Sequence, residues 1–341
     1  MEKQFIYADN AATTKMSDVA VKAMLPYLQE IYANASSVHL LGQRSAAALF
    51  SARQQVAQVL NCAPKEVFFT SGGSEADNQA LISAAALGKK QGKCHIVSTA
   101  MEHHAILHTL EALQVKGFTV TLLRPQADGI VTATQVAEAI TDTTCLVSVM
   151  YANNETGAIQ PIREIGALCR KRGVLFHTDA VQAAGHLTIC LLYTSERAGT
   201  ENLPGIIGLA AALKDAQENM QQNTSYITGL RTALRNGLDK IDCAGFNGSR
   251  EHCLPGTVNY SFQGVNGEAL LSLLSNEGIC CSSGSACSAG SLEPSHVLLA
   301  LGLSHETAQS ALRFSLCEYN TMDEVQTIIT KVTEAVNRLR R

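Results

Sequence analysis

Residues 145–182 read CLVSVMYANNETGAIQPIREIGALCRKRGVLFHTDAVQ, and this stretch decides the fold. A strand-like apolar run is followed by a helical segment, which Pro161 opens and Gly173 closes, and then by a second apolar run. Proline in the first turn and glycine just past the last turn are the usual ends of a helix. Two strands connected through one helix predict parallel pairing, in a sheet that helices cover on both faces.

The same alternation extends from about residue 42 to residue 181. Apolar runs predict strands at VFFT, HIVST and TVTLL, with helical segments between them. We therefore predict a large α/β domain with a mostly parallel sheet over residues 15–205. After Pro204 a long helical segment leads into mixed segments, which predict a smaller α+β domain over residues 206–341, joined by residues 1–14.

Composition excludes several classes of protein. Hydrophobic residues make up 46% of the chain, charged residues 16%, and the net charge of -4 gives no reason to expect nucleic-acid binding. No signal peptide precedes the first strand and no apolar stretch is long enough to span a bilayer, so we expect no membrane partner and a cytoplasmic location. The eleven cysteines are then expected to be reduced. Cys280 and Cys281 are adjacent, which is poor spacing for zinc, and no metal site is expected.

Polar residues follow four of the predicted strands, at the sheet edge where ligands bind in such folds. After VFFT, the glycines of SGGSEADN allow close backbone approach and open a helix whose N-terminus favours an anion. A glycine turn before a helix is also commonplace. After HIVST come His103 and His104, either of which serves as a helix cap or as a functional imidazole.

Two further strand ends carry amides and a carboxylate. Asn153, Asn154 and Glu155 follow CLVSVM, where asparagines are also common turn formers. Asp179 follows VLFH, where it either caps a turn or neutralises a buried partner. An anion-binding loop, an imidazole, an amide and a buried carboxylate together match what pyridoxal phosphate (PLP) requires: a phosphate grip, ring stacking, a hydrogen bond to the ring oxygen and an acid at the pyridine nitrogen.

Two residues of the second predicted domain are candidates for chemistry. Cys287 lies in the small-residue loop CCSSGSACSAGS, which is either incidental or a suitable place for a thiol that must reach two partners in turn. Arg313 lies within the apolar run ALRFSL, where a buried guanidinium requires an anion. A substrate carboxylate would meet that requirement through two parallel hydrogen bonds.

The chain closely resembles the cysteine desulfurases of the class V aminotransferase family, in the subgroup that supplies sulfur for iron-sulfur clusters. The resemblance implies a type I PLP-dependent transferase fold and a homodimer with its active site at the subunit boundary. It covers nearly the whole chain in the family's order, through the stretches YADNAATT, NASSVH, FTSGGSEADN, MEHHAI, NNETG, HTDAVQ, RAGTEN, SSGSAC, SLEPSHVLLALGL and RFSL.

The resemblance also implies a role for each matching residue. Gly73 and Ser74 would hold the cofactor phosphate, with Thr200 reaching the phosphate of the neighbouring subunit. His103 would stack on the ring, Asn154 and Gln182 would bond its oxygen, and Asp179 would pair with its nitrogen. Arg313 and Asn34 would fix the carboxylate of L-cysteine. Cys287 would take the sulfur as a persulfide, leave alanine, and pass the sulfur to an acceptor such as an iron-sulfur scaffold protein.

The stretch HTDAVQAAGHLTICLLYTSERAGTEN departs from the family. Between GHLTI and RAGTEN the family has two further strands and the Ser-x-His-Lys motif whose lysine forms the Schiff base, whereas this chain has only CLLYTSE, residues 190–196. No lysine occurs between Lys171 and Lys214, and no His-Lys pair occurs anywhere. Covalent cofactor attachment is therefore not expected, and little desulfurase activity is predicted. NASS, where the family usually has a proline, is a small departure.

Three hypotheses remain. The first is a cysteine desulfurase whose sequence is damaged by a misjoined gene. The second is a natural lysine-free relative that binds a partner or holds PLP without a covalent bond. The third is a sulfur carrier that uses the SSGSAC loop. In each case the lost strands predict unpaired sheet edges, uncovered apolar faces and poor solubility.

Overall fold

The computed structural model describes residues 5–189, 201–283 and 293–340. The chain divides into two compact units. The first comprises Met1–Thr14, Leu81–Gln182 and Asn223–Arg341, and the second comprises Lys15–Ala80 and Ala183–Gln222. Helix α7, Leu203–Leu238, runs without a break through residues 205 and 206 and contributes to both units. The domain boundary predicted there stays a prediction.

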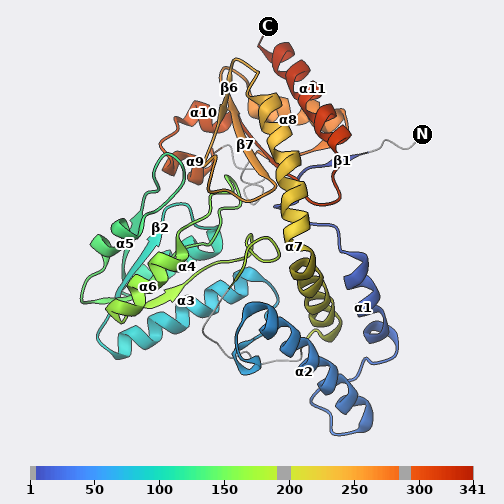
Figure 1. The fold of residues 1–341 in the computed structure, drawn as a ribbon. Helices are drawn as coiled ribbons and strands as arrows, with labels where there is room; N and C mark the ends of the chain where they lie inside the picture. Colours follow the sequence, from blue (N-terminus) through green and yellow to red (C-terminus); the bar gives the residue numbers. More distant parts are fainter. Residues whose placement is uncertain (1–4, 190–200, 284–292, 341) are drawn as a thin grey trace. The chain divides into compact units, whose positions relative to one another are not determined.

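A parallel sheet forms the centre of the first unit, and its strands appear with the helices around them in Figure 1. Its order is β3-β2-β4-β5, and every neighbouring pair is parallel. The predicted α/β class with a parallel sheet is thus confirmed. The strands are β2 (His95–Thr99), β3 (Thr119–Leu123), β4 (Thr144–Ser148) and β5 (Leu175–His177).

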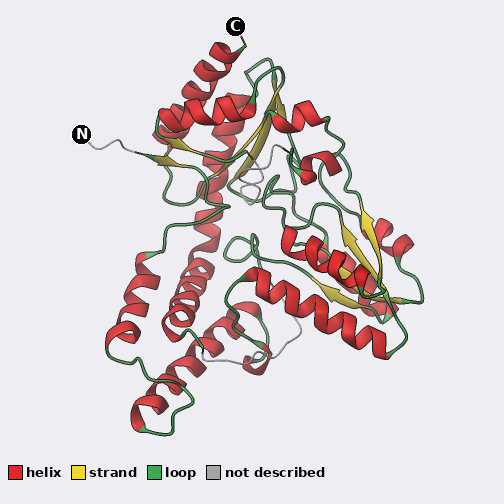
Figure 2. Ribbon diagram, turned by 180° about the vertical axis from the view of Figure 1, so that it is seen from behind, coloured by secondary structure: helices red, strands yellow, loops and turns green. Residues whose placement is uncertain are grey.

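Side-chain alternation along the strands gives this sheet two buried faces. Leu146 packs with α3 (Gly73–Lys90) and α4 (His104–Val115), whereas Val147 packs with α5 (Ala133–Ala139) and α6 (Ile162–Arg172). Ile96 and Val97 of β2 divide between the two faces in the same way. Figure 2 shows these strands in yellow among red helices. Both faces are buried because successive side chains of a strand point in opposite directions.

The strand predicted at VFFT does not form, and that prediction was wrong. Residues 67–70 belong to no strand or helix, and Val67 and Phe69 are buried in the core of the second unit. Arg53 donates to the carbonyl of Val67. An apolar run becomes a strand only when another backbone lies beside it, and no strand does so within the described residues of the second unit.

An antiparallel sheet of order β6-β7-β9 completes the first unit. It consists of β6 (Ala244–Phe246), β7 (Thr257–Phe262) and β9 (Ala311–Ser315). It shares a core with α8 (Gly267–Asn276), α11 (Met322–Leu339) and the end of α7. The short helices α9 (His296–Ala300) and α10 (His305–Gln309) precede β9. Strand β1 (Ile6–Tyr7) pairs in parallel with β8 (Ile279–Cys280), which brings the N-terminal segment to this part of the chain.

The second unit is helical where it is described. It contains α1 (Asp18–Gln29), α2 (Leu40–Leu60), the 3-10 helix η1 (Pro64–Glu66) and the first part of α7. Several large apolar side chains of α1, α2 and the segment between them are exposed: Leu25, Leu28, Tyr32, Val38, Leu40 and Phe50. Val38, the extreme case, is 90% exposed. This unit therefore leaves much of its apolar surface uncovered.

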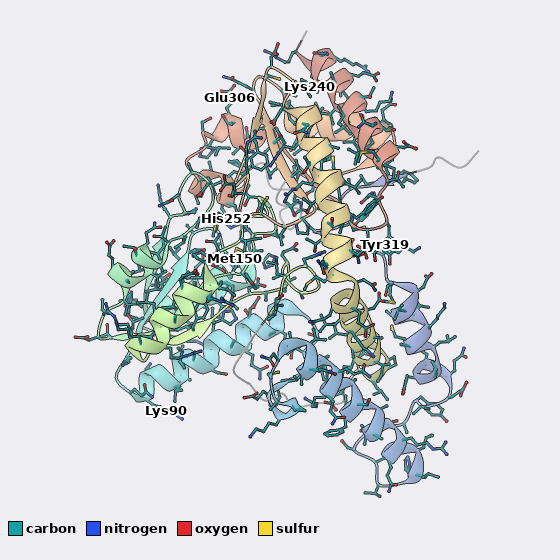
Figure 3. All side chains as sticks on the ribbon, in the orientation of Figure 1. Lys90, Met150, Lys240, His252, Glu306 and Tyr319 are labelled. Atoms are coloured by element: carbon teal, nitrogen blue, oxygen red, sulfur yellow. The ribbon has the colours of Figure 1, made fainter. Side chains whose placement is uncertain are left out.

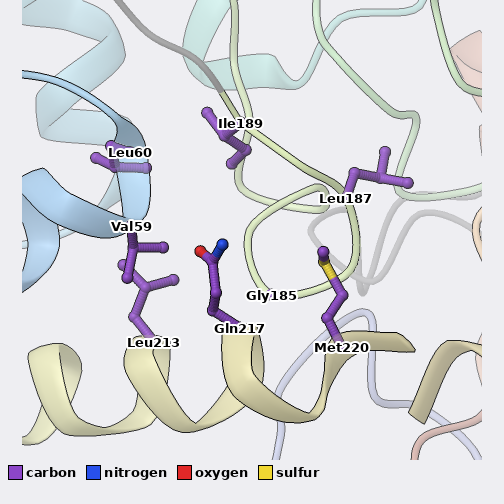
Figure 4. Close-up of a pocket in the computed structure, with 8 residues that line it drawn as sticks. All are labelled: Val59, Leu60, Gly185, Leu187, Ile189, Leu213, Gln217 and Met220. Atoms are coloured by element: carbon purple, nitrogen blue, oxygen red, sulfur yellow. The ribbon is translucent and has the colours of Figure 1, made fainter. Parts of the chain in front are cut away.

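A pocket of about 260 Å³, part of which is open to solvent, lies within the second unit. Figure 4 shows the end of α2, the segment before residue 190 and α7 around it. It is lined by Val59, Leu60, Gly185, Leu187, Ile189, Leu213, Gln217 and Met220. With a single amide in an apolar lining, this pocket has none of the charged groups that a phosphate or an amino acid requires.

None of the helices in the described chain is both long enough and apolar enough to cross a membrane. Within residues 5–189, 201–283 and 293–340, no group of three or more histidine, cysteine, aspartate or glutamate side chains is arranged to hold a metal ion.

Candidate functional site

The loop after β4 is held by a fully buried asparagine. Asn153 donates from Nδ2 to the carbonyl of Met101 at 3.0 Å, and its Oδ1 accepts from the backbone N–H groups of Glu155 and Thr156 at 3.0 and 2.9 Å. Asn153 is thus a turn former, as one of the two sequence interpretations proposed. These bonds fix the backbone of its neighbour, Asn154.

Asn154 leaves its side chain available. Its carbonyl accepts from Arg313 Nη1 at 2.9 Å, while its half-buried amide forms no hydrogen bond within the described residues. Two site candidates from different sheets of the first unit are therefore in direct contact. The free amide has the donor and acceptor that a ring oxygen or a substrate carboxylate would use.

Arg313 on β9 is 1% exposed and already has an anion. Its Nη2 donates to Asp9 Oδ1 at 2.7 Å. The sequence predicted that this guanidinium needs a negative partner, and Asp9 supplies one from within the protein. The role of Arg313 toward a substrate carboxylate stays a prediction. Its Nε is buried without a hydrogen-bond partner among the described residues.

Glu155 is a buried carboxyl beside this arginine. Ser295, the N-cap of α9, donates to Glu155 Oε2 and accepts from the backbone N–H of Leu298. Burial raises the pKa of Glu155, and the Ser295 hydrogen bond and the charges of Arg313 and His103 offset part of that rise. Glu155 thereby connects the loop after β4 to the start of α9.

His103 caps the helix that follows β2. Its Nδ1 accepts from the backbone N–H of Ala105 at 3.2 Å, which satisfies one donor at the start of α4. The capping interpretation of His103 is therefore confirmed, and its stacking on a cofactor stays a prediction. The ring centroid of His104 lies 4.6 Å from that of His296 and 5.1 Å from that of His108.

Asp179 and Gln182 follow β5 at the same edge of the sheet. Asp179 is 9% exposed, its Oδ1 accepts from the Val181 N–H at 2.9 Å, and its carbonyl accepts from the Tyr151 N–H at 2.8 Å. Asp179 thus caps a turn, which was one of its two sequence interpretations. Gln182 donates from Nε2 to the carbonyl of Ala11 at 3.0 Å.

The N-terminal segment 9–11 therefore contacts both sides of this edge, through Asp9 to Arg313 and through Ala11 to Gln182. Four of the predicted residues lie in the first unit at the carboxyl edge of the parallel sheet: His103, Asn154, Asp179 and Gln182. The fifth, Arg313, lies on β9 and contacts Asn154.

Three predicted residues lie in the second unit. Gly73 begins α3 and is followed by Ser74. The next residue, Glu75, accepts at Oε2 from both the N–H and the hydroxyl of Ser71, each at 2.6 Å. A carboxylate thus occupies the anion position before this helix. Asn34 accepts from the Ser36 N–H at 2.8 Å, and its turn packs so closely on Gly42 that a Cβ there would overlap the Ser37 carbonyl.

Cys287 and Thr200 lie outside the described residues. The neighbouring Cys281 is described, and burial together with the charge of Asp9 raises the pKa of its thiol far above the usual range. A thiol held protonated is a poor nucleophile, so Cys281 is no substitute for Cys287.

The lysines of residues 81–182 lie at the wrong edge of the sheet for the missing role. Lys93 precedes β2, Lys116 precedes β3 and Lys171 precedes β5, so each lies toward the amino end of a parallel strand. Asp179 follows the carboxyl end of β5. Lys90 ends α3, away from Met150 beyond β4, as Figure 3 shows. In the second unit, Lys214 lies on an exposed face of α7, where its Nζ is 3.8 Å from Glu218 Oε1.

Sequence reasoning missed Asp9 and Ser295. Asp9 lies in YADNAATT two residues after the end of β1, as Asp179 lies two residues after the end of β5. Ser295 precedes a short helix as serine caps commonly do. Neither pattern indicates a partner that is 304 positions away, as for Asp9, or 140 positions away, as for Ser295.

The residues of the first unit fit PLP chemically. A buried carboxylate, an amide without a partner in the described chain and an imidazole follow adjacent strands. The buried, unpartnered Nε of Arg313 is a further donor there. The carboxylate suits a protonated pyridine nitrogen, the amide suits a ring oxygen, the imidazole suits a ring face, and the arginine donor suits a carboxylate.

A parallel sheet covered on both faces, with these groups after its strands, defines the PLP-dependent transferase class. The chain belongs to the class V aminotransferase family. The model of that family, Aminotransferase class-V, matches residues 6–193 and 192–328. Its fold is like that of a solved NifS-like protein, with a TM-score of 0.91 and 32% identity over 98% of this chain and all of that one.

The similar sequences are cysteine desulfurases. Cysteine desulfurase IscS of Clostridium botulinum (strain Hall) is 40% identical over 383 residues, which cover 100% of this chain and 96% of the relative. Cysteine desulfurase IscS of Methanosarcina thermophila is 40% identical over 379 residues, which cover 99% and 94%. The solved SspA in complex with cysteine has a TM-score of 0.76 and 30% identity, over 92% of this chain and 99% of that one.

Proposed function

We propose that this chain carries the substrate and cofactor site of a PLP-dependent cysteine desulfurase that acts on L-cysteine, and that the absence of a lysine at that site impairs turnover. One observation carries the proposal: within the described residues the Asn154 side-chain amide forms no hydrogen bond, while the Asn154 carbonyl accepts from the buried guanidinium of Arg313. One hydrogen bond thus connects Asn154, which would bind the cofactor, to Arg313, which would bind the substrate carboxylate.

Each residue has a role that its surroundings support. PLP, when bound, supplies an electron sink for bonds at the substrate's α-carbon. Asp179, buried after β5, would hold a proton on the ring nitrogen, and Asn154 with Gln182 would bond the ring oxygen. His103 would cover one ring face. Gly73, Ser74 and Thr200 would bind the phosphate. Just before α3, the Ser71 N–H already donates to a negatively charged group, the Glu75 carboxylate.

Arg313 and Asn34 would hold the substrate carboxylate, and Cys287 would take the sulfur. In that step a bond forms between the Cys287 sulfur and the substrate sulfur. The substrate's carbon–sulfur bond breaks, and its β-carbon keeps the electron pair and gains a proton to give alanine. The persulfide then passes its outer sulfur to an acceptor such as an iron-sulfur scaffold protein.

Two features of the comparisons support a missing segment. The family matches break at residues 192 and 193, within CLLYTSE. The alignment with the Clostridium relative spans 383 positions against 341 residues here, so at least 42 positions, the difference between the two, hold no residue of this chain. The segment VFFT pairs with no strand among the described residues, which agrees with a loss of neighbouring strands. The general base and the cofactor-binding amine would be lost together.

Borohydride reduction with PLP, followed by peptide mapping, tests the lysine. We expect PLP to bind and to be removed by dialysis even after reduction, because the lysines within residues 81–182 precede the strands of the parallel sheet and lie toward its amino edge. A labelled lysine peptide would contradict the proposal. Sulfide release from L-cysteine should not exceed that of Cys287→Ala, and PLP-dependent release well above that variant would also contradict it.

The absence of a lysine leaves a second candidate, a non-catalytic relative that binds a partner or carries sulfur. Asp179, Arg313 and Cys287 all remain in the sequence, which favours the enzyme, because a relative released from catalysis would be expected to lose them as well. Sequencing the gene across codons 186–200 distinguishes a natural junction from a misjoined one. Transfer of sulfur to Cys287 from a persulfide donor, without PLP, would favour the carrier.

We also propose a homodimer, as the family resemblance implies. The exposed Leu25, Leu28, Tyr32, Val38 and Leu40 support it, because side chains of this kind on neighbouring helical segments require cover. Light scattering after gel filtration should give twice the chain mass of 36.3 kDa. A clean monomer at micromolar concentration would overturn this part of the proposal.

A further inference from the structure

The guanidinium of Arg313 is only partly used by the protein. Of its five N–H donors, one on Nη2 meets Asp9 Oδ1 at 2.7 Å and one on Nη1 meets the Asn154 carbonyl at 2.9 Å. The Nε donor has no partner in the described chain. The remaining donors suffice for a second carboxylate, which takes two of them in parallel.

The backbone sets this geometry firmly. Asp9 forms a parallel bridge with Ser315, two residues beyond Arg313, and Ser315 donates its N–H to the Ala8 carbonyl at 2.7 Å. Arg313 also exchanges two backbone hydrogen bonds with Ser282. The side chains of Asp9 and Arg313 are thus held together across adjacent segments 304 positions apart in sequence.

We propose that Asp9 is a positioning residue that acts as the internal counter-ion of Arg313 and limits the affinity of the site for a carboxylate ligand. The identity of that ligand, the carboxylate of L-cysteine, rests on the proposed function. In the ligand-free protein Asp9 neutralises a cation that is 1% exposed. When a carboxylate binds, Asp9 becomes a like charge on the same guanidinium.

These two effects have opposite signs. A buried arginine without a counter-charge destabilises the fold, so removal of the Asp9 charge lowers stability. The same removal takes away the repulsion that a bound carboxylate meets, so affinity rises. A residue that merely supported the fold would lower both stability and affinity.

The other charged groups near Arg313 do not replace Asp9. Glu155 is hydrogen-bonded to Ser295, burial raises its pKa, and it forms no ion pair with the arginine. Burial and the charge of Asp9 keep the Cys281 thiol protonated. Asp9 is therefore the negative charge that Arg313 contacts within the described residues.

The test compares Asp9→Asn with Asp239→Asn. Asp239 pairs with Arg250 at 2.9 Å on an exposed part of the same unit, so its variant controls for the loss of an Asp–Arg pair away from the site. Calorimetry on PLP-free full-length protein measures binding of L-cysteine and, as a probe without the carboxylate, L-cysteine methyl ester. Thermal denaturation without ligand measures stability.

We expect Asp9→Asn to lower the midpoint of unfolding and to bind L-cysteine at least about tenfold more tightly. Its affinity for the methyl ester should not change, and Asp239→Asn should bind both ligands as the unsubstituted protein does. Should Asp9→Asn not fold, Asp9→Glu is the second variant. Its longer side chain keeps the negative charge and brings it closer to the guanidinium donors that a ligand would use, so L-cysteine should bind several-fold more weakly.

Unchanged or weaker L-cysteine binding by a folded Asp9→Asn variant would overturn the inference about Asp9, while binding by the unsubstituted protein would still support the proposed substrate. Binding only by the variant would support the inference and count against the proposed substrate. Binding by neither protein would count against both.

Discussion

At the scale of single residues, Asn153 organises the loop that positions the Asn154 amide and the Glu155 carboxyl. Its side chain is fully buried, and both of its polar atoms are bonded to the backbone of other residues. Substitution would leave several buried backbone groups without partners.

We therefore predict that Asn153→Ala lowers the free energy of unfolding by about 2–4 kcal/mol, measured by urea denaturation. Asn219→Ala provides the control, because Asn219 is exposed and bonds only Asp215 one turn away in α7. Its effect should stay within about 0.5 kcal/mol. Equal losses in the two variants would show that the Asn153 bonds contribute little.

The contact between His104 and His296 predicts a dependence of stability on pH. Burial, His296, His108 and His103 lower the pKa of His104, and Glu111 partly opposes them. Burial lowers the pKa of His296 too, against its hydrogen bond to the Glu102 carbonyl. Above the ordinary histidine pKa of about 6.5 both imidazoles are neutral in the folded and in the unfolded chain. Below it the unfolded chain binds protons first, so stability falls as pH decreases toward the folded pKa.

His296→Gln should therefore flatten the stability profile below pH 6.5 relative to the unsubstituted protein. Because other groups, including Glu155, also titrate, the difference between the two urea-denaturation profiles is the quantity to measure. The exposed His305→Gln provides the control. A His296→Gln profile parallel to that of the unsubstituted protein would contradict this assignment.

At the scale of elements, α9 and α10 form a matched pair. Each has five residues and a serine N-cap that accepts from the third helical residue. Ser295 also donates to the buried Glu155 carboxyl, whereas Ser304 bonds Thr307 at the surface. The two caps differ mainly in this buried carboxyl.

We predict that Ser304→Ala lowers the free energy of unfolding by about 1 kcal/mol, which is typical for the loss of a helix cap. Ser295→Ala should lower it by about 1–3 kcal/mol more, because Glu155 also loses its hydrogen-bond donor. The excess should grow as pH rises through the range where Glu155 ionises, since its pKa is raised. Denaturation of both variants at two pH values checks this. An excess that is absent or independent of pH would contradict it.

At the scale of the whole molecule, the two units differ in how they are built. The first unit contains three sheets and buried cores, whereas the regular elements described in the second unit are helices and several of its large apolar side chains are exposed. We predict faster hydrogen exchange in α1 and α2 than in β2 and β4, measured by mass spectrometry. The C-terminal α11 provides a helical control in the first unit. Uniform exchange would indicate that the second unit is fully supported.

Sequence patterns predicted most of the first unit. Short apolar runs located β2, β3 and β4, and helical periodicity located the helices between them, because strands buried on both faces are apolar along their length. The strand predicted at VFFT failed because pairing depends on a neighbouring backbone, which a local pattern does not contain. Among the site candidates, the cap roles of His103 and Asp179 were foreseen as alternatives, and the Asp9 partner of Arg313 was not.

The sequence by itself determined the alternation of strands and helices, the placement of polar residues after the strands, and the absence of a lysine between Lys171 and Lys214. All of these are local properties, set by the order of side chains along the backbone. Only the tertiary structure decided that Arg313 contacts Asp9 and Asn154, that Ser295 contacts Glu155, and that the remaining lysines of the sheet layer lie at its amino edge. Those contacts depend on strand pairing and packing between distant segments.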